Sequence, residues 1–369
     1  MSKVGETTLV LDLSALEHNY NYLRSKIKPK TKFLGVVKAF AYGSDTVTIA
    51  RELEQLGADY LAVAYVSEGM LLRNAGVKIP ILVLHPLASN FEDLIVHRLE
   101  PSIYSRNILN QFLEVAKEKQ QTDYPIHIKF NTGLNRLGFS EDDVDFIARE
   151  TKHSGCIKIV STFSHLAASE DANERDFSLL QINSFKNLSD ALRKKIGYTP
   201  IRHMLNTSGI INYPNAQFEM VRSGIGLYGY GNQAEVDSQL KPVATLKTII
   251  SQIHEIKANQ SVGYNRAFRS SNTIKSATLP IGHADGIGRQ YGKGKGFVVI
   301  NGEKAPIVGN VCMDMIMVDV TGIDCQEGDE VVVFGSDNSA ENFASSANTI
   351  SYEILTAISQ RVKRVLIEA

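Results

Sequence analysis

Residues 33–43 form one continuous run, Phe33-Leu34-Gly35-Val36-Val37-Lys38-Ala39-Phe40-Ala41-Tyr42-Gly43. Its first part is short, apolar and rich in branched side chains, which is typical of a buried parallel strand. The strand pattern ends abruptly in Lys38, and burying an unpaired ammonium group is costly. A partly desolvated lysine has a lowered pKa, so it can act as a nucleophilic amine and form a Schiff base with an aldehyde. A lysine that extends into solvent from a strand end fits this stretch equally well.

Apolar runs of this kind recur as far as residue 226, and helical patterns separate most of them. The predicted strands are Phe33–Lys38, Tyr60–Tyr65, Ile81–His85, Pro101–Ser105, Ile126–Phe130, Ile159–His165, Ile201–Asn206 and Phe218–Gly226. Eight strands that alternate with helices predict a (β/α)8 barrel of the α/β class rather than an open doubly wound sheet. We assign this domain to residues 1–236, which also contain a first strand at Thr8–Asp12 and a helix that begins near Ser14.

The alternation stops near Gly229, where a polar connection begins. Beyond it the chain is rich in strand-like runs, and the only helical patterns cover residues 339–347 and 351–360. The predicted strands are Ala244–Ile256, Ser276–Gly282, Gly296–Asn301, Ala305–Val308, Met315–Val320, Glu330–Gly335 and Val362–Ile367. Residues 237–369 are therefore predicted to form a second domain that is mostly β.

Composition limits the class of protein. The chain has 369 residues, 43% of them hydrophobic, and a formal net charge of -1. Such a balance gives no broad attraction to nucleic acid or to an anionic membrane, so we expect neither partner. Three widely spaced cysteines form neither a disulfide framework nor a zinc pattern, so we expect no metal. The N-terminus is polar without a signal-peptide core, and no apolar run is long enough to span a bilayer, so we expect a cytoplasmic protein.

Polar side chains fall at the predicted ends of five barrel strands. They are Lys38, Lys129, His165, Asn206 and Arg222. Catalytic residues of such barrels gather where strands end and loops begin, so this convergence predicts a site at the C-terminal face. Each residue also has an ordinary structural interpretation, and for His165 alone a satisfied core histidine would be favoured.

Two further segments could contribute to the site. Residues 224–229 formally match a dinucleotide-binding pattern, but they follow seven βα units and precede a polar loop. Their glycines are better suited to close approach of the backbone to a phosphate group. In the second domain, Tyr264, Met313, Asp314 and Tyr352 stand out in loops or at a helix start, although an isolated tyrosine is usually half-buried packing.

Taken together, these motifs resemble those of the alanine racemases, which use pyridoxal 5'-phosphate (PLP). The resemblance covers residues 8 to 367. It includes the motifs Lys38–Gly43, Asn131–Phe139, Ser164-His165, Asn206-Thr207, Arg222–Gly229, Gly263-Tyr264, Ala284–Gly286, Cys312–Asp314 and Tyr352–Ile354. It implies an N-terminal (β/α)8 barrel, a C-terminal β domain and a head-to-tail homodimer whose active sites use residues from both chains.

The resemblance also implies a role for each matching residue. Lys38 would form the Schiff base with PLP and act as the base on one face of the substrate, and Tyr264 of the partner would serve the other face. Arg222 would face the pyridine nitrogen, with His165 linking it to Tyr264. Arg136 and the backbone N–H of Met313 would contact the substrate carboxylate, with Lys129 steadying Arg136 and Asp314 as a second supporting residue. The phosphate would be held by Tyr42, Thr207, Gly224, Ile225 and Tyr352, and Asn206 would also bind the cofactor.

The function implied is interconversion of L- and D-alanine, which supplies D-alanine for peptidoglycan. A serine or broad-specificity racemase on the same scaffold is an alternative, because Phe40, His283 and Met315 depart from residues common in the family. An amino-acid decarboxylase of the same architecture is disfavoured, because Arg222 replaces the acidic pyridine partner of those enzymes. A non-catalytic PLP-binding protein would lack the second domain that carries Tyr264.

Overall fold

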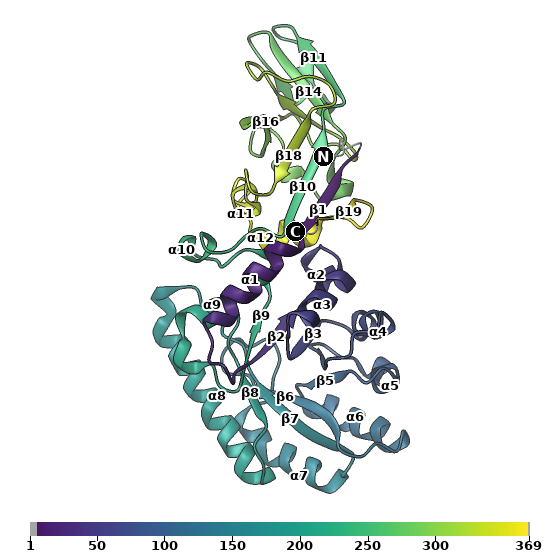
Figure 1. The fold of residues 1–369 in the computed structure, drawn as a ribbon, viewed down its shortest axis with the longest axis vertical. Helices are drawn as coiled ribbons and strands as arrows, with labels where there is room; N and C mark the ends of the chain where they lie inside the picture. Colours follow the sequence, from purple (N-terminus) through teal and green to yellow (C-terminus); the bar gives the residue numbers. More distant parts are fainter. Residues whose placement is uncertain (1–5, 368–369) are drawn as a thin grey trace.

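A computed structural model describes residues 6–367 (Figure 1). The barrel predicted from the sequence is confirmed: eight parallel strands close on themselves in the order β2 to β9. Their bounds are β2 (Lys32–Val36), β3 (Tyr60–Val63), β4 (Ile81–Val83), β5 (Glu100–Ile103), β6 (Tyr124–Lys129), β7 (Ile157–Phe163), β8 (Ile201–His203) and β9 (Met220–Ser223). Each strand lies within or beside a predicted apolar run, and most end one to three residues earlier than expected.

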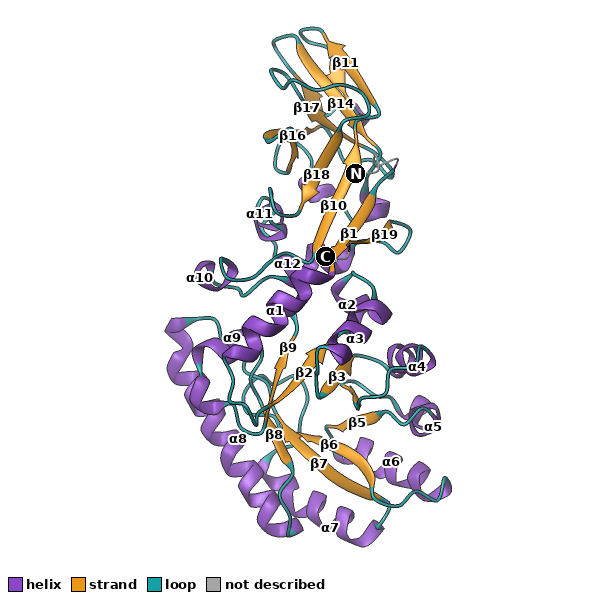
Figure 2. Cartoon of the chain, in the orientation of Figure 1, coloured by secondary structure: helices purple, strands orange, loops and turns teal. Residues whose placement is uncertain are grey.

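Helices surround the barrel strands (Figure 2). They are α1 (Leu13–Ser25), α2 (Lys38–Tyr42), α3 (Thr46–Gln55), α4 (Val66–Asn74), α5 (Phe91–Val96), α6 (Arg106–Glu118), α7 (Val144–Ser154), α8 (Arg175–Ile196) and α9 (Thr207–Asn212). Side-chain caps define several helix starts. Asp12, for example, accepts from the N–H of Ala15, and Asp45 accepts from the N–H of Thr48. The amphipathic helices bury their apolar stripes against the strands, which gives the barrel a continuous hydrophobic shell.

The second domain is built on a nine-stranded sheet with the order β11-β14-β17-β16-β15-β18-β10-β1-β19. Its strands are β1 (Thr8–Asp12), β10 (Ala244–Ile249), β11 (Gln252–Ile256), β14 (Ile274–Leu279), β15 (Phe297–Ile300), β16 (Glu303–Val308), β17 (Ile316–Asp319), β18 (Glu330–Phe334) and β19 (Lys363–Ile367). The remaining described strands and α-helices are the small pair β12 (Ser261–Val262) and β13 (Phe268–Arg269) and the helices α10 (Ala234–Asp237), α11 (Ala340–Ser345) and α12 (Ser351–Ala357).

Strand β1 corrects one part of the domain assignment. It pairs antiparallel with β10 and parallel with β19, so it belongs to the second sheet and not to the barrel. Local sequence could not reveal this, because both partners lie more than two hundred residues further along the chain. The barrel therefore begins after Asp12, while the boundary near residue 236 stays a prediction. The predicted strand Ala244–Ile256 is likewise two strands, β10 and β11.

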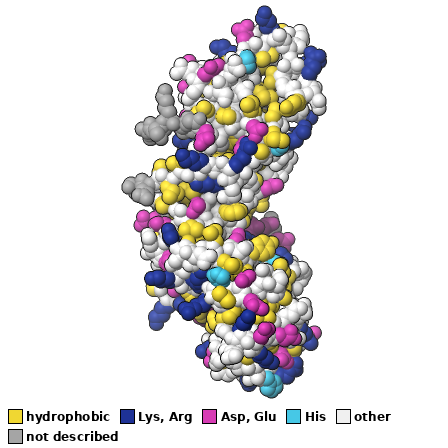
Figure 3. All heavy atoms as spheres, turned by 90° about the vertical axis from the view of Figure 1, so that its right-hand side faces the viewer, with side chains coloured by type: hydrophobic (Ala, Val, Ile, Leu, Met, Phe, Trp, Pro, Cys, Tyr) yellow, Lys and Arg dark blue, Asp and Glu magenta, His cyan; other side chains and the backbone are white. Residues whose placement is uncertain are grey.

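The surface agrees with the balanced composition. On the face drawn in Figure 3, basic and acidic side chains are interspersed over both halves of the molecule. No helix between residues 6 and 367 combines the length and the apolar character needed to cross a bilayer. In the same part of the chain, no group of three or more His, Cys, Asp or Glu side chains is arranged to hold a metal ion.

Candidate active site

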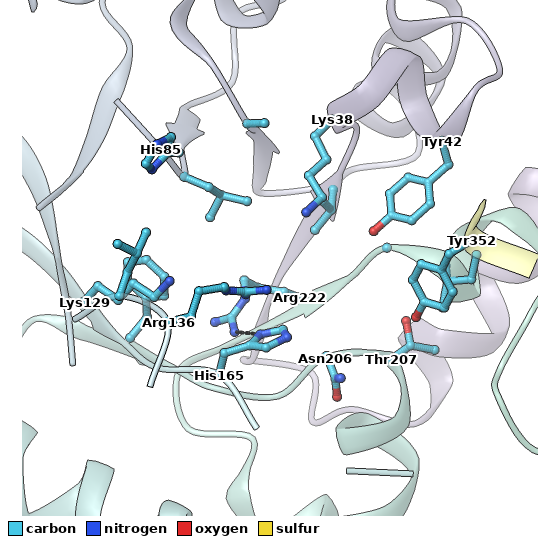
Figure 4. A pocket seen from close by; sticks show the side chains of 17 residues that line it. Lys38, Tyr42, His85, Lys129, Arg136, His165, Asn206, Thr207, Arg222 and Tyr352 are labelled. Atoms are coloured by element: carbon cyan, nitrogen blue, oxygen red, sulfur yellow. Dashed lines mark hydrogen bonds between the residues drawn. The ribbon is translucent and has the colours of Figure 1, made fainter. Parts of the chain in front are cut away.

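A cavity of about 620 Å³ opens at the C-terminal ends of the barrel strands (Figure 4). Eleven residues predicted for the site line it: Lys38, Tyr42, Lys129, Arg136, His165, Asn206, Thr207, Arg222, Gly224, Ile225 and Tyr352. All but Tyr352 come from the barrel domain, and Tyr352 lies in α12, which packs against α2. The fold therefore brings together residues that are more than three hundred positions apart in the chain.

Lys38 projects into this cavity from α2, just beyond strand β2 (Figure 4). The predicted strand Phe33–Lys38 ends at Val36, so the lysine belongs to the turn that follows. Burial lowers the pKa of Lys38, and the nearby Arg136 lowers it further, while Glu68 acts in the opposite direction. A larger fraction of the amine is therefore unprotonated and nucleophilic near neutral pH than for an exposed lysine.

The turn that carries Lys38 is left-handed. Residues 39–42 all have positive φ, at 52° to 55°, and Gly43 follows with φ 80°. Left-handed backbone costs about 1–2 kcal/mol for each residue with a Cβ, so surrounding contacts must hold the turn in place. Glu68 accepts the N–H of Ala39 at 2.7 Å, and the Arg364 guanidinium donates to the carbonyl of Gly43 at 2.8 Å.

Four basic side chains converge on the cavity: Lys38, Lys129, Arg136 and Arg222 (Figure 4). Burial lowers the pKa of Lys129 to about 8, and the charges of Arg136, Arg222 and Lys38 contribute to the shift. Lys129 and Arg222 also lie over the same aromatic ring, 5.7 and 5.5 Å from the ring centre of Phe163. Such a concentration of positive charge favours anionic ligands.

Arg222 is held rigidly by its surroundings. Its guanidinium donates to the carbonyls of Ser164 and Met204 at 2.7 and 2.9 Å, and to Nδ1 of His165 at 3.2 Å (Figure 4). Burial and the neighbouring cations, Arg222 first among them, lower the pKa of His165 well below its usual range. His165 is therefore neutral, with Nδ1 as the acceptor and its proton on Nε2.

Hydroxyl groups gather at one end of the cavity. The Tyr42 hydroxyl lies so close to Gly224 that a Cβ there would be 2.2 Å from it. Thr207 accepts the N–H of Gly226 at 3.2 Å, and the Tyr352 hydroxyl receives a hydrogen bond from Asn232. This cluster, with the backbone at residues 224–226, is suited to an anion with several oxygen atoms.

Three predicted site residues lie elsewhere. Tyr264, Met313 and Asp314 line a separate pocket of about 420 Å³ in the second domain, together with Met315. Tyr264 is 71% exposed, which excludes the half-buried packing role that an isolated tyrosine usually has. Asp314 is tied to this domain through Arg361, whose guanidinium also binds Asp285. One chain thus carries two sets of site residues that do not meet.

The three residues that were expected to depart from the family pattern, Phe40, His283 and Met315, do not line the barrel cavity. Phe40 is 53% exposed in the left-handed turn, and Met315 lines the second pocket. Sequence reasoning missed two polar residues at the barrel cavity: His85, which lines it, and Glu68, which supports the Lys38 turn. His85 stands at the end of the predicted strand Ile81–His85, so the rule that identified Lys38 also applies to it.

At its strand ends, this closed parallel barrel carries a desolvated lysine and a cluster of hydrogen-bond donors suited to an anion. This combination is typical of barrel enzymes that work through a lysine at that face. The family models described as alanine racemase, N-terminal domain, and alanine racemase, C-terminal domain, match residues 11–232 and 243–366. The chain therefore belongs to the alanine racemase family, whose members are isomerases.

Individual relatives agree over nearly the whole chain. The sequence is 37% identical to alanine racemase 1 of Clostridium acetobutylicum, covering 97% of this chain and 94% of that protein. A solved alanine racemase from Clostridium difficile 630 superposes with a TM-score of 0.92 at 33% identity, covering 99% and 96%. The alanine racemase of Bartonella henselae, solved with covalently bound pyridoxal phosphate, gives 0.90 at 30% identity, covering 99% and 100%.

Proposed function

We propose that this protein is an alanine racemase that interconverts L- and D-alanine with PLP as its cofactor. The observation that carries the proposal is Lys38, a lysine of lowered pKa placed among cationic and hydroxyl groups at the end of a barrel strand. The chain's membership of the family supports the same reaction. Formation of D-alanine for peptidoglycan is the biological role that follows from it.

The cavity fits PLP on three points. Lys38 supplies the amine for the cofactor aldehyde, and the cluster of Tyr42, Thr207, Tyr352 and the backbone near Gly224 suits the phosphate. Arg222 uses its two terminal nitrogens for hydrogen bonds to the described residues, which leaves Nε–H as the donor for the pyridine nitrogen. The chemistry that the bound cofactor supplies is withdrawal of electron density from the α-carbon of the amino acid.

The protein's own groups then handle the proton. Lys38 Nζ, with its lowered pKa, removes or returns the α-proton on one face. The Tyr264 hydroxyl does the same on the opposite face, and it comes from a second copy of the chain, because in one chain Tyr264 and Lys38 lie in different pockets. Two bases on opposite faces give racemisation directly.

Substrate orientation would come from both chains. Arg136 lines the barrel cavity and carries the positive charge that an amino-acid carboxylate requires. The backbone N–H of Met313, presented with Tyr264 in the second pocket, adds a donor from the partner. We therefore propose a homodimer as the active unit. The three cysteines are free thiols, which fits a reducing compartment, and we place the enzyme in the cytoplasm.

The reaction is tested with purified enzyme and PLP in heavy water, to which L-alanine or L-serine is added separately. Deuterium incorporation at the α-carbon is measured by mass spectrometry, and optical rotation is followed in parallel. Loss of rotation together with deuterium entry, faster for alanine, is the expected result. A faster reaction with serine would change the substrate but keep the mechanism. Bound PLP with neither signal would contradict the proposal.

A further inference from the structure

Arg222 is a buried cation that has no carboxylate beside it among residues 6–367. Arg222 is only 5% exposed. Every hydrogen bond that it makes to the described residues is accepted by a neutral group, either a backbone carbonyl or a histidine ring nitrogen. Burial lowers its pKa to about 9. A buried charge in this situation needs a compensating partner, since desolvation is expensive.

A chain of hydrogen bonds leads from Arg222 to such a partner. Arg222 donates to Nδ1 of His203 at 2.7 Å, and Nε2 of His203 lies 2.9 Å from the Ser161 hydroxyl. The same hydroxyl lies 2.5 Å from Nδ1 of His127, whose Nε2 lies 2.7 Å from a carboxylate oxygen of Glu100. His127, Ser161 and His203 are at most 1% exposed, so water does not compete for these bonds.

The two ends of the chain fix its direction. A guanidinium can only donate, so Nδ1 of His203 is the acceptor and its ring proton is on Nε2, facing Ser161. A carboxylate can only accept, so Nε2 of His127 carries a proton that faces Glu100. Ser161 accepts from His203 and donates to Nδ1 of His127. Every hydrogen bond then points from Arg222 toward Glu100, an arrangement in which each bond polarises and strengthens the next.

The barrel itself sets this path. The five residues come from five consecutive strands: Glu100 from β5, His127 from β6, Ser161 from β7, His203 from β8 and Arg222 from β9. Glu100 is the first residue of its strand, whereas Arg222 lies near the end of its strand. The chain of hydrogen bonds therefore crosses the barrel interior obliquely, from the opening opposite the active site to the wall of the active-site cavity.

From this geometry we infer that Glu100, His127, Ser161 and His203 are positioning residues that act through Arg222. They fix the plane of the guanidinium and balance its charge, so that Nε–H stays aimed at the pyridine nitrogen of the cofactor. No proton has to travel along the chain. The inference rests on the proposed function, because orienting Arg222 has a purpose only if the cofactor is bound beside it.

The structure offers a matched pair of substitutions. Ser161→Ala removes the hydroxyl at the centre of the chain. Ser102→Ala removes another fully buried hydroxyl, on strand β5, which is separated from β7 by β6 alone; this hydroxyl has no hydrogen-bond partner among the described residues. Ser102 is also paired in register with His127, so both changes occur in the same part of the barrel. Ser161→Thr keeps the hydroxyl and serves as the conservative variant.

The experiment compares the holoenzymes after labelling histidine with nitrogen-15. NMR of the wild type is expected to place the ring proton of His127 and that of His203 on Nε2. Ser161→Ala should shift the ring signals of both histidines and the visible absorption band of bound PLP. It should also lower kcat about tenfold, with KM nearly unchanged. Ser102→Ala should match the wild type, and Ser161→Thr should recover most of kcat.

Two results would overturn the inference. One is a wild-type His203 or His127 protonated at Nδ1 alone, which breaks the chain, and it is measured without any variant. The other is a Ser161→Ala enzyme whose PLP band and kcat equal those of the wild type. A wild type that binds PLP but racemises neither alanine nor serine would instead refute the proposed function, and the NMR result would still decide whether the chain exists.

Discussion

Lys38 carries the most specific prediction at the scale of a residue. Lys38→Ala should abolish racemisation and the covalent link to PLP, because no other amine replaces Nζ at that position. The matched control is Lys32→Ala at the start of strand β2, where the lysine is partly exposed and pairs with Asp59. Racemisation rates and borohydride trapping of PLP on the protein measure both effects. Normal turnover in Lys38→Ala would remove Lys38 from the mechanism.

Lys129 gives a prediction about pH. Its native pKa is about 8, below the value of 10.5 for an unperturbed lysine, so the unfolded chain binds more protons between these values. The buried charge therefore lowers the unfolding free energy by its full amount below pH 8, and this loss becomes smaller as pH rises toward 10.5. Lys129→Met should raise the unfolding free energy of the cofactor-free protein by about 1–3 kcal/mol at pH 7 and much less at pH 10.

Urea unfolding at the two pH values measures this difference. Lys158→Met is the control, since Lys158 is exposed on the adjacent strand β7 and should give the same small effect at both. If Lys129→Met raised the unfolding free energy equally at both pH values, the charge of Lys129 would not be the cause of the destabilisation.

Several of these residues could be predicted from the sequence alone, and others could not, for a physical reason. Lys38, Lys129 and Arg222 were found because parallel strands of a barrel end on one face, so a polar residue after an apolar run is informative. Ser161 and His203 give no such signal. They lie inside the predicted strands Ile159–His165 and Ile201–Asn206 and not at their ends, and their hydrogen bonds are defined only when the strands are in register.

At the scale of an element, the left-handed turn after β2 is the least predictable part of the barrel. Ala39, Phe40 and Ala41 have no preference for positive φ, and only Gly43 suits it locally. The turn exists because contacts from distant elements hold it. The carbonyl of Leu355 in α12 packs so tightly on Gly43 that a Cβ there would lie 1.9 Å from the oxygen.

This packing gives a prediction with an internal control. Gly57 also has positive φ, at 89°, but a Cβ there would meet nothing within 4 Å. Gly57→Ala should lower the unfolding free energy by about 1 kcal/mol, the cost of the backbone alone. Gly43→Ala should cost about 3 kcal/mol or more and weaken PLP binding, because α12 must move. Equal losses in urea unfolding would show that Leu355 does not constrain the turn.

At the scale of the whole molecule, the separation of Lys38 from Tyr264 predicts complementation. Lys38→Ala and Tyr264→Ala enzymes are each expected to be inactive or nearly so. After the subunits exchange, a mixed dimer contains one site with both substitutions and one with neither. Activity should therefore return to about a quarter of the wild-type level in an equal mixture. No recovery, with exchange demonstrated by mass spectrometry of tagged subunits, would show that Tyr264 does not act across the dimer.

The first strand of the chain has a consequence for how the protein is made. Strand β1 leaves the ribosome before the barrel, yet its two neighbours in the sheet, β10 and β19, are among the later segments to be synthesised. Arg364, which holds the turn behind Lys38, lies in β19 itself. A nascent chain can thus form most of the barrel early, but the turn that presents Lys38 is secured only after β19 has emerged from the ribosome. The geometry around Lys38 therefore depends on a segment that is synthesised more than three hundred residues later.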